Sequence, residues 1–136
     1  MEVVRSIDPE KQIAYTTITG KITLAEIRAE MAKLPTLPGF NPLLPGLIDL
    51  RQATVALTGD DIRQIADAIK ARPDTFKGTR RALLVNSDLM FGLYRMFATF
   101  ASDSEAEYRI FREEKQAHEW LEKLAKSLET PKKPAS

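Results

Sequence analysis

Two short segments near the start of the chain have the hydrophobic and β-branched residues typical of β-strands. β-Branched and aromatic residues fill residues 13–19, and a shorter run of the same kind occupies residues 2–7. Between them, residues 8–11 read DPEK, and the proline presets one backbone dihedral angle for a turn. We therefore expect these two segments to pair as an antiparallel hairpin.

Four later segments carry apolar residues at the three- and four-residue spacing of an amphipathic helix. Each follows a residue or an acidic turn that suits a helix amino terminus. Prolines at positions 35 and 73 stop the first two, since the residue before a proline disfavours helix. The four helices are predicted to begin just after Thr23, after Thr58, after Ser87 or Asp88, and at about Glu113.

Three short runs between these helices predict the remaining strands. Residues 46–50 and 80–86 are largely apolar, as in strands covered on both faces, and residues 108–112 alternate. The element order is β-β-α-β-α-β-α-β-α. This order predicts an α/β fold with a mainly parallel five-stranded sheet, one antiparallel edge strand and helices on both faces. The first strand is expected at that antiparallel edge.

The chain has 136 residues, which suits a single domain. We expect this domain to span residues 1–128 and residues 129–136 to form a disordered tail, because the tail is polar and rich in proline. Within the domain, residues 35–46 contain four prolines, two glycines and several large apolar side chains. Such a loop either packs over the edge of the core or serves as a lid over a ligand, and the sequence favours the first.

The predicted helix at 87–103 is apolar around much more of its circumference than the roughly 100° stripe of a surface helix. The sheet is expected to cover one half of it, which holds Leu89, Leu93, Phe97 and Phe100. Other large side chains then need a different cover, because leaving several exposed is unfavourable. These are Met90, Phe91 and Tyr94.

Four bodies could cover that face. A neighbouring helix or the proline-rich loop would make it part of the core, and a second copy of the chain would make it a dimer interface. An apolar small molecule could lie between the helix and the sheet, or a bilayer could take the face with Arg95 near the headgroups. We expect such a ligand at the carboxyl ends of the parallel strands, near residues 51–58 and 86–90.

Composition and charge exclude several classes of function. Hydrophobic residues make up 43% of the chain and charged residues 29%, and the net charge is +1. No overall field therefore attracts nucleic acid. The absence of cysteine excludes disulfides and thiolate chemistry, and no apolar run approaches the roughly 18 residues of a membrane span. We expect a cytoplasmic protein, with peripheral membrane attachment if a bilayer covers the apolar face.

Groups that could support catalysis are scarce. The single histidine, His118, is predicted to point outward from the last helix, and one histidine without cysteine cannot build the usual zinc site. Ser87 lacks the flanking glycines of a nucleophile elbow and suits a helix cap. Asp49 lies in an apolar strand, where it needs hydrogen-bond donors. We therefore predict no enzyme activity, no metal and no cofactor.

A basic cluster before the second buried strand offers one further candidate site. It contains Arg72, Lys77, Arg80 and Arg81, and its simplest interpretation is a solvated edge. The alternative is contact with an anionic headgroup or an acidic partner. The residues assigned to such anion contact are Arg80, Arg81 and Arg95.

The element order, the motif GLIDLR at 46–51 and the segment at 91–124 resemble the SpoIIAA-like family. This family belongs to the larger STAS group of anti-sigma-factor antagonists and is close in fold to the lipid-carrying CRAL-TRIO domains. The resemblance implies binding of apolar ligands or membranes, as suggested for some members, or binding of protein partners.

Anti-sigma-factor antagonists carry a phosphorylatable serine at the start of the helix that follows the LIDL-type strand. Thr58 is the nearest residue here, but Leu57 precedes it where an acid is expected. A phosphate on Thr58 would also meet Asp60 and Asp61, whose like charge opposes it. Thr58 is therefore predicted first as a plain helix cap and second as a phosphorylation switch.

Two hypotheses follow. The preferred one is a non-enzymatic domain that binds an apolar small molecule or a membrane surface through the 87–103 helix, by way of Met90, Phe91, Tyr94 and Phe97. The alternative is a protein-interaction module of the antagonist type, regulated at Thr58. A homodimer is compatible with either hypothesis.

Overall fold

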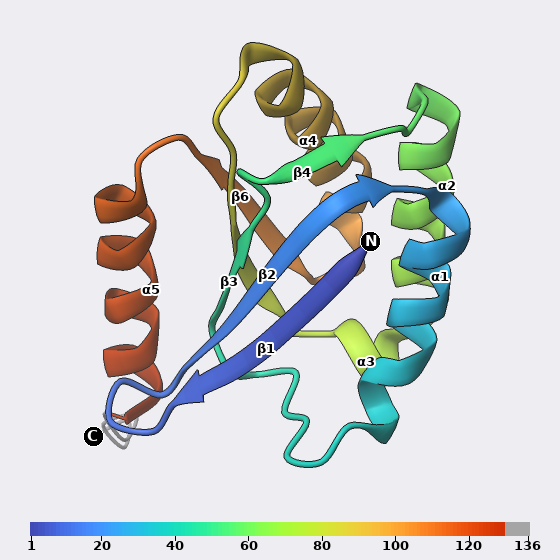
Figure 1. Cartoon of the computed structure of the whole chain (residues 1–136). Coiled ribbons are helices and arrows are strands. Elements are labelled where there is room, and N and C mark those ends of the chain that lie inside the picture. Colours follow the sequence, from blue (N-terminus) through green and yellow to red (C-terminus); the bar gives the residue numbers. More distant parts are fainter. Residues whose placement is uncertain (130–136) are drawn as a thin grey trace.

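A mixed six-stranded sheet runs through the middle of the protein, in a computed structural model that describes residues 1–129 (Figure 1). The strands follow the order β1-β2-β3-β5-β6, and β4 pairs with the far end of β2. β1 is antiparallel to β2, and every other pair is parallel, as predicted. The strands are β1 (Glu2–Asp8), β2 (Ile13–Ile22), β3 (Gly46–Asp49), β4 (Ala53–Val55), β5 (Arg80–Leu84) and β6 (Glu107–Phe111).

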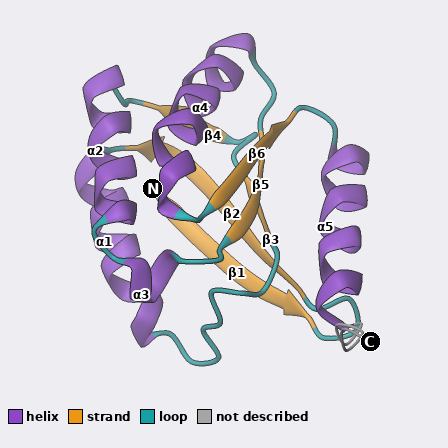
Figure 2. Ribbon diagram, turned by 180° about the vertical axis from the view of Figure 1, so that it is seen from behind, coloured by secondary structure: helices purple, strands orange, loops and turns teal. Residues whose placement is uncertain are grey.

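Helices cover both faces of the sheet. α1, α2 and α4 lie over one face, which we call the inner face, and α5 lies alone over the other (Figures 1 and 2). The short α3 and two 3₁₀ turns, Leu34–Thr36 and Ser102–Ser104, connect these elements. The helices are α1 (Leu24–Lys33), α2 (Gly59–Lys70), α3 (Pro73–Phe76), α4 (Asp88–Ala101) and α5 (Glu114–Glu129).

Strand register decides which side chains meet on each face. Gly46 of β3 pairs with Ala14 on one side and with Arg81 on the other, and Arg81 pairs in turn with Tyr108 of β6. Side chains alternate between faces along a strand, so this row belongs to the inner face. The residues one position away point to α5 and build a second, smaller core. That core consists of Ile13, Leu47, Ala82, Ala117, Leu121 and Ala125.

The sheet has one strand more than the five expected. β4 has only three residues, too few for a recognisable period, and it forms because β2 continues to Ile22 rather than stopping at Gly20. Gly20 adopts φ +82° within that extension. The short α3 was also missed, since four residues give no helical pattern. Residues 130–136 of the predicted tail lie outside the described residues, whereas Glu129 still belongs to α5.

The predicted orientation of α4 is partly wrong. Leu89 was expected against the sheet and is 77% exposed, whereas Met90 and Tyr94 were expected to lack cover and are buried. Phe97 is buried as predicted. The difference arises because α4 packs against α2 as well as β6, so its buried arc is rotated toward α2. The neighbouring helix, one of the four covers considered for this face, therefore supplies most of the cover.

Candidate functional site

α1 directs its apolar side chains toward the sheet without burying any of them completely. None of its residues is buried, and its close backbone neighbours are α2 and the 3₁₀ turn that follows it rather than a strand. On the opposite side, Ile48 lies on the inner face of a central strand and is also only partly buried. Apolar side chains that face inward and remain accessible indicate an open space between α1 and the sheet.

That space is a cavity of about 570 Å³. Ligand sites typically measure roughly 300–1,000 Å³ and have mainly apolar walls with a few polar groups. The sheet forms its floor, α1 and α2 form its sides, and residues 37–41 of the proline-rich loop close one end together with Leu44. Its apolar wall includes Ile18, Ile22, Ile27, Met31, Ile48, Leu50, Ile62, Ile65 and Ile69.

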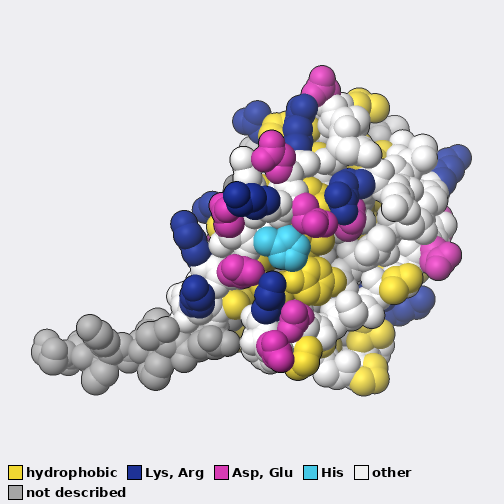
Figure 3. Space-filling view, turned by 60° about the vertical axis from the view of Figure 1, so that its left-hand side comes forward, with side chains coloured by type: hydrophobic (Ala, Val, Ile, Leu, Met, Phe, Trp, Pro, Cys, Tyr) yellow, Lys and Arg dark blue, Asp and Glu magenta, His cyan; other side chains and the backbone are white. Residues whose placement is uncertain are grey.

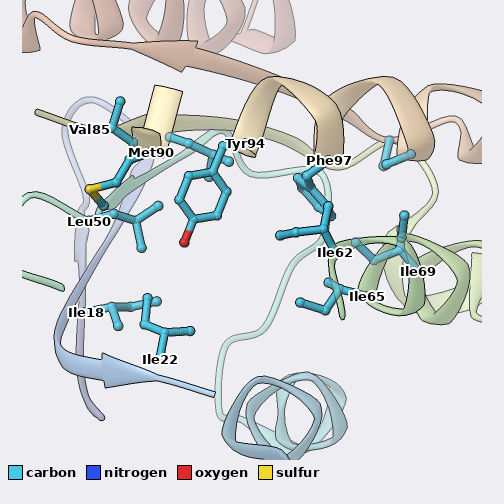
Figure 4. Packing of buried hydrophobic residues seen from close by; sticks show 14 of the residues in the cluster. Ile18, Ile22, Leu50, Ile62, Ile65, Ile69, Val85, Met90, Tyr94 and Phe97 are labelled. Atoms are coloured by element: carbon cyan, nitrogen blue, oxygen red, sulfur yellow. The ribbon is translucent and has the colours of Figure 1, made fainter. Parts of the chain in front are cut away.

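α4 contributes two aromatic side chains to the cavity, Tyr94 and Phe97 (Figure 4). The Tyr94 oxygen points away from α4 toward the interior, and it makes no hydrogen bond to another residue of the described range 1–129 (Figure 4). Burial raises the pKa of Tyr94 to about 12. Its hydroxyl therefore stays neutral at physiological pH and is available to donate or accept a hydrogen bond.

An ion pair marks the mouth of the cavity. Arg5 of β1 lines the cavity and is exposed to solvent, and its Nη2 lies 2.7 Å from Oε2 of Glu30 on α1. Lys33 approaches the other Glu30 oxygen at 3.2 Å. Arg5, with Lys33 in support, holds the pKa of Glu30 below its usual value. This pair ties the edge strand to α1 across the opening.

One end of the cavity, beside Leu44 of the proline-rich loop, is polar. Thr75 and Thr79 are 4% and 3% exposed, and both line the cavity. Arg81 and Tyr108 line it as well, from neighbouring positions on β5 and β6. Thr79 and Arg81 share a face because they are two residues apart, and the Thr79 carbonyl accepts from the Glu107 amide next to Tyr108. We call these four residues, Thr75, Thr79, Arg81 and Tyr108, the polar end.

Arg81 is the charged group of the polar end. Its Nη1 donates to the Leu44 carbonyl at 2.6 Å and to the Arg80 carbonyl at 3.0 Å. It forms no ion pair with any residue between 1 and 129. Burial lowers the pKa of Arg81. Burial likewise raises the pKa of Tyr108 to about 12, although Arg81 opposes part of that shift.

The three arginines predicted to contact anions lie in different surroundings. Arg80 pairs with Glu107 at 3.7 Å, and Arg95 lies over the Phe91 ring at 5.7 Å. Arg112 covers the same ring at 4.6 Å. Only Arg81 reaches the cavity. The predicted cluster is thus divided between a paired surface edge and a single inward-facing cation.

The residues predicted to bind a ligand are also divided. Tyr94 and Phe97 line the cavity, whereas Met90 belongs to the core beside it and Phe91 lies under two arginines outside it. The cavity also differs from the expected location, since it lies beneath α1 and the proline-rich loop, and of residues 51–58 and 86–90 only Leu57 lines it. Sequence reasoning missed its α1 wall, whose apolar stripe resembles that of any packed helix. The apolar proline-rich loop could have indicated the cavity, through its alternative interpretation as a lid over a ligand.

Thr58 acts as a helix cap, as predicted. Its Oγ1 accepts from the Asp61 amide at 3.1 Å, and the Asp61 carboxylate accepts from the Thr58 amide at 2.9 Å. Asp49 obtains its donors from Arg51, whose amide and guanidinium both donate to it. Arg51 lowers the pKa of Asp49 and also pairs with Glu114 at 3.1 Å, which ties β3 to the start of α5.

The α5 side of the molecule carries mixed charges and no sign of a metal site. The only histidine, His118, lies among basic and acidic side chains there (Figure 3). Its ring centre is 5.7 Å from that of Tyr15. Within residues 1–129, no three histidine or acidic side chains gather closely enough to hold a metal. None of the helices in this part of the chain is long and apolar enough to cross a membrane.

Comparison with known proteins identifies the fold. No protein-family model matches the sequence, and no curated protein matches it. Among solved structures, an uncharacterised protein of the DUF3478 family with a SpoIIAA-like fold, from Shewanella loihica PV-4, aligns with a TM-score of 0.58 and 19% identity. That alignment covers 88% of this chain and 92% of the other.

An anti-sigma factor antagonist from Mycobacterium paratuberculosis aligns with a TM-score of 0.53 and 12% identity, over 88% of this chain and 94% of the other. At such identities, the similarity establishes the fold. It agrees with the observed order of strands and helices, including the antiparallel edge strand. The chain therefore has the SpoIIAA-like fold, which it shares with an anti-sigma factor antagonist.

Proposed function

We propose that the protein is a non-enzymatic binding domain that holds an apolar small molecule in the cavity between α1 and the sheet. The cavity itself is the observation that carries this proposal. Its volume suits a small ligand, its walls are mainly aliphatic, and polar groups occur at its mouth and at one end. This combination is typical of a site that encloses an apolar body and orients it by a few polar contacts.

Energetics favour an occupied cavity. Apolar side chains around an unfilled space lose packing contacts, and in protein cores this costs about 24 cal/mol per Å³ of cavity. Side chains such as Ile27, Met31 and Ile48 line the cavity and are only partly buried by the rest of the chain. An apolar ligand would bury these surfaces and restore the lost contacts.

A bilayer has less support as the main ligand. The proposed contact through α4 depended on Met90 and Tyr94 facing outward, and both are buried. Leu89 is exposed on that helix, and Val4, Ile7 and Leu43 are exposed elsewhere. Isolated exposed apolar residues are common on protein surfaces. The cavity is therefore the better site for a lipid-like molecule.

Displacement of a neutral fluorescent probe, N-phenyl-1-naphthylamine, tests the proposal directly. The probe should bind the purified protein at one site, and myristyl alcohol should displace it. Ile48→Phe places a ring in the cavity and should weaken probe binding at least tenfold. Val4→Phe is the matched control, because Val4 lies on β1 outside the cavity and is 58% exposed. Absence of probe binding to the wild-type protein, or equal binding by Ile48→Phe, would overturn the proposal.

A second candidate function is a protein-interaction module, and the antagonist among the solved structures favours it. A shallow groove between α4 and β6, lined by Phe91, Arg95 and Arg109 among others, gives this candidate a surface. Its partner could be another protein or a second copy of the chain. Affinity capture with wild-type protein and with Arg95→Asp tests the groove, since a partner bound there should be lost with the variant.

Regulation of that interaction at Thr58 has its own test. Thr58→Ala removes the cap, so a change in binding would mix stability with signalling. Thr58→Asn keeps a capping oxygen and cannot be phosphorylated. If phosphorylation controls partner binding, Thr58→Asn should abolish the control while the protein remains folded. Equal partner binding by wild-type protein and Thr58→Asn, with and without kinase treatment, would exclude the switch.

A further inference from the structure

The charges that line the cavity do not balance. Arg5, Glu30 and Arg81 are the lining residues with charged side chains, and the amino terminus of Met1, which also lines the cavity, pairs with Glu26. Arg5 and Glu30 pair with each other at the mouth, 2.7 Å apart. Arg81 has no acidic partner among residues 1–129, so one positive charge at the polar end is left without compensation.

Arg81 also has hydrogen-bond donors to spare. A guanidinium carries five N–H donors, and those on Nη1 go to the carbonyls of Leu44 and Arg80. Nε and Nη2 make no hydrogen bond within the described part of the chain. No fully buried side-chain nitrogen or oxygen there lacks a partner, so these free donors must be accessible. An accessible guanidinium edge on the wall of an apolar cavity is suited to bidentate binding of a carboxylate.

Three neutral hydroxyl side chains line the same cavity as this edge. Thr75 and Thr79 are buried, and their side chains make no hydrogen bond to another residue of 1–129. The Tyr108 hydroxyl is likewise without a hydrogen-bond partner in that range, and its side chain neighbours Arg81 across the β5–β6 pair. Three neutral hydroxyls and one cation can satisfy the several lone pairs of a single carboxylate. They hold too little positive charge for a dianion such as a phosphate monoester.

We infer that the cavity binds a long-chain monocarboxylic acid, a fatty acid, with its carboxylate on Arg81 and the hydroxyls of Thr75, Thr79 and Tyr108, and its chain along the aliphatic wall toward Tyr94. This inference rests on the proposed function and adds the chemical class of the ligand. Binding in this orientation offsets the desolvation of Arg81 and fills the space below α1 at the same time.

A comparison of head groups on one chain tests the inference. Myristic acid, myristyl alcohol and myristyl phosphate are each used to displace N-phenyl-1-naphthylamine from the full chain. The acid should bind at least tenfold more tightly than the alcohol and more tightly than the phosphate. Equal affinities for acid and alcohol would overturn the inference and leave the proposed function standing. Tighter binding of the phosphate would overturn the carboxylate assignment, and no binding of any probe would overturn the proposed function itself.

Variants of Arg81 locate the head group. Arg81→Met should reduce affinity for myristic acid about tenfold, to the level of the alcohol, and leave alcohol binding unchanged. Arg80→Met is the matched control, because Arg80 lies one residue away and pairs with Glu107 outside the cavity. Arg81→Lys keeps the charge without the planar fork and should give an intermediate affinity. If Arg81→Met does not fold, Arg81→Lys and the head-group comparison still test where the carboxylate binds. Unchanged selectivity for myristic acid over myristyl alcohol in Arg81→Lys would show that the carboxylate binds elsewhere.

Discussion

The Arg81 side chain lies across Gly46 of the neighbouring strand, in space that only a glycine leaves open. A Cβ at position 46 would stand 2.9 Å from Arg81 Cδ and 3.0 Å from Nε. Real Cβ atoms hardly ever approach other heavy atoms so closely, so any larger residue at 46 must displace the arginine. Gly46, the first residue of the motif GLIDLR, thus leaves the space that positions the Arg81 guanidinium in the cavity.

Gly46→Ala should therefore act through Arg81. The added methyl group moves the guanidinium away from the Leu44 carbonyl and the polar end, so the free energy of unfolding should fall by about 0.5–1.5 kcal/mol, as for loss of one hydrogen bond. The selectivity for myristic acid over myristyl alcohol should fall as well. Denaturant unfolding and probe displacement measure the two effects.

Gly59→Ala is the control for that change. A Cβ at position 59 would meet Met96 Cε at 3.5 Å, which is an ordinary contact. Gly59→Ala should leave the selectivity for myristic acid over myristyl alcohol unaltered. Full selectivity in Gly46→Ala would show that Arg81 does not need its position over β3.

Two of the three tyrosines that line the cavity, Tyr94 and Tyr108, should make stability depend on alkaline pH. Burial raises the pKa of Tyr94 and Tyr108 from 10.0 to about 12. The unfolded chain, whose tyrosines titrate near 10, loses their protons first, so the contribution of these two tyrosines to the free energy of unfolding should be constant below pH 10 and fall as the pH rises toward 12. Tyr94→Phe and Tyr108→Phe should each remove part of this slope.

Absorbance of tyrosinate during an alkaline titration checks this prediction in the native protein, and denaturant unfolding at several pH values checks the slope. Tyr15 provides the internal comparison, because it also lines the cavity and burial raises its pKa in the same direction, but Lys11 opposes part of that shift. If Tyr94 or Tyr108 ionised like a free tyrosine, it would be in water and not in a closed apolar site.

Much of the fold was accessible from the sequence, because long amphipathic segments and buried strands have distinct periods. Turn chemistry correctly predicted the hairpin, and caps at Thr23, Thr58 and Ser87 correctly predicted three helix starts. β4 and α3 were not predicted, since three or four residues are too few to show a strand or helix period. They form only because neighbouring elements are already in place. Their existence is a property of tertiary context.

The cavity was harder to predict than the fold. An apolar stripe such as that of Ile27 and Met31 is the same whether the helix touches the sheet or lies some distance from it. The spacing of apolar residues shows which face of the helix points to the sheet, but not how far away the sheet is. The sequence correctly showed that α4 is apolar around much of its circumference. The preferred explanation, a bound ligand or membrane, was not needed for most of that surface, since α2 covers it. Arg81 was recognised as a candidate for anion contact, but only the strand register separates it from Arg80.

The ion pair between Arg5 and Glu30 should control entry to the cavity. It joins β1 to α1 across the mouth, so Glu30→Gln should speed both association and dissociation of N-phenyl-1-naphthylamine several-fold, with little change in affinity. Stopped-flow fluorescence measures these rates. The pair also has a pH signature, because Arg5 lowers the pKa of Glu30. Its stabilisation is present above the unfolded pKa of Glu30, near 4.5, and is lost as the pH falls through the lower folded value.

Glu2→Gln is the matched control for that variant, since Glu2 lies at the start of β1 and does not line the cavity. It should leave the exchange rates at the wild-type level. Rates in Glu30→Gln that equal those of the wild-type protein would mean that ligands enter by another route, for example past the proline-rich loop.

A glycine on the solvent side of α4 offers a test of the orientation of that helix. A Cβ at Gly92 would meet no atom within 4 Å, and the backbone there is helical. Gly92→Ala should raise the free energy of unfolding by about 0.5–1 kcal/mol, because alanine loses less backbone entropy on folding. Thermal or denaturant unfolding measures the change, and probe affinity should not alter, since the methyl group points away from the cavity.

Gly39 gives the opposite expectation and so completes the test. A Cβ there would also meet nothing within 4 Å, but the backbone has φ +73°. Gly39→Ala should therefore lower the free energy of unfolding by about 1 kcal/mol, from backbone strain alone. The two alanines differ in backbone conformation and not in the space around them. If Gly92→Ala destabilised the protein instead, the added methyl group would have to meet other atoms, and this orientation of α4 would be wrong.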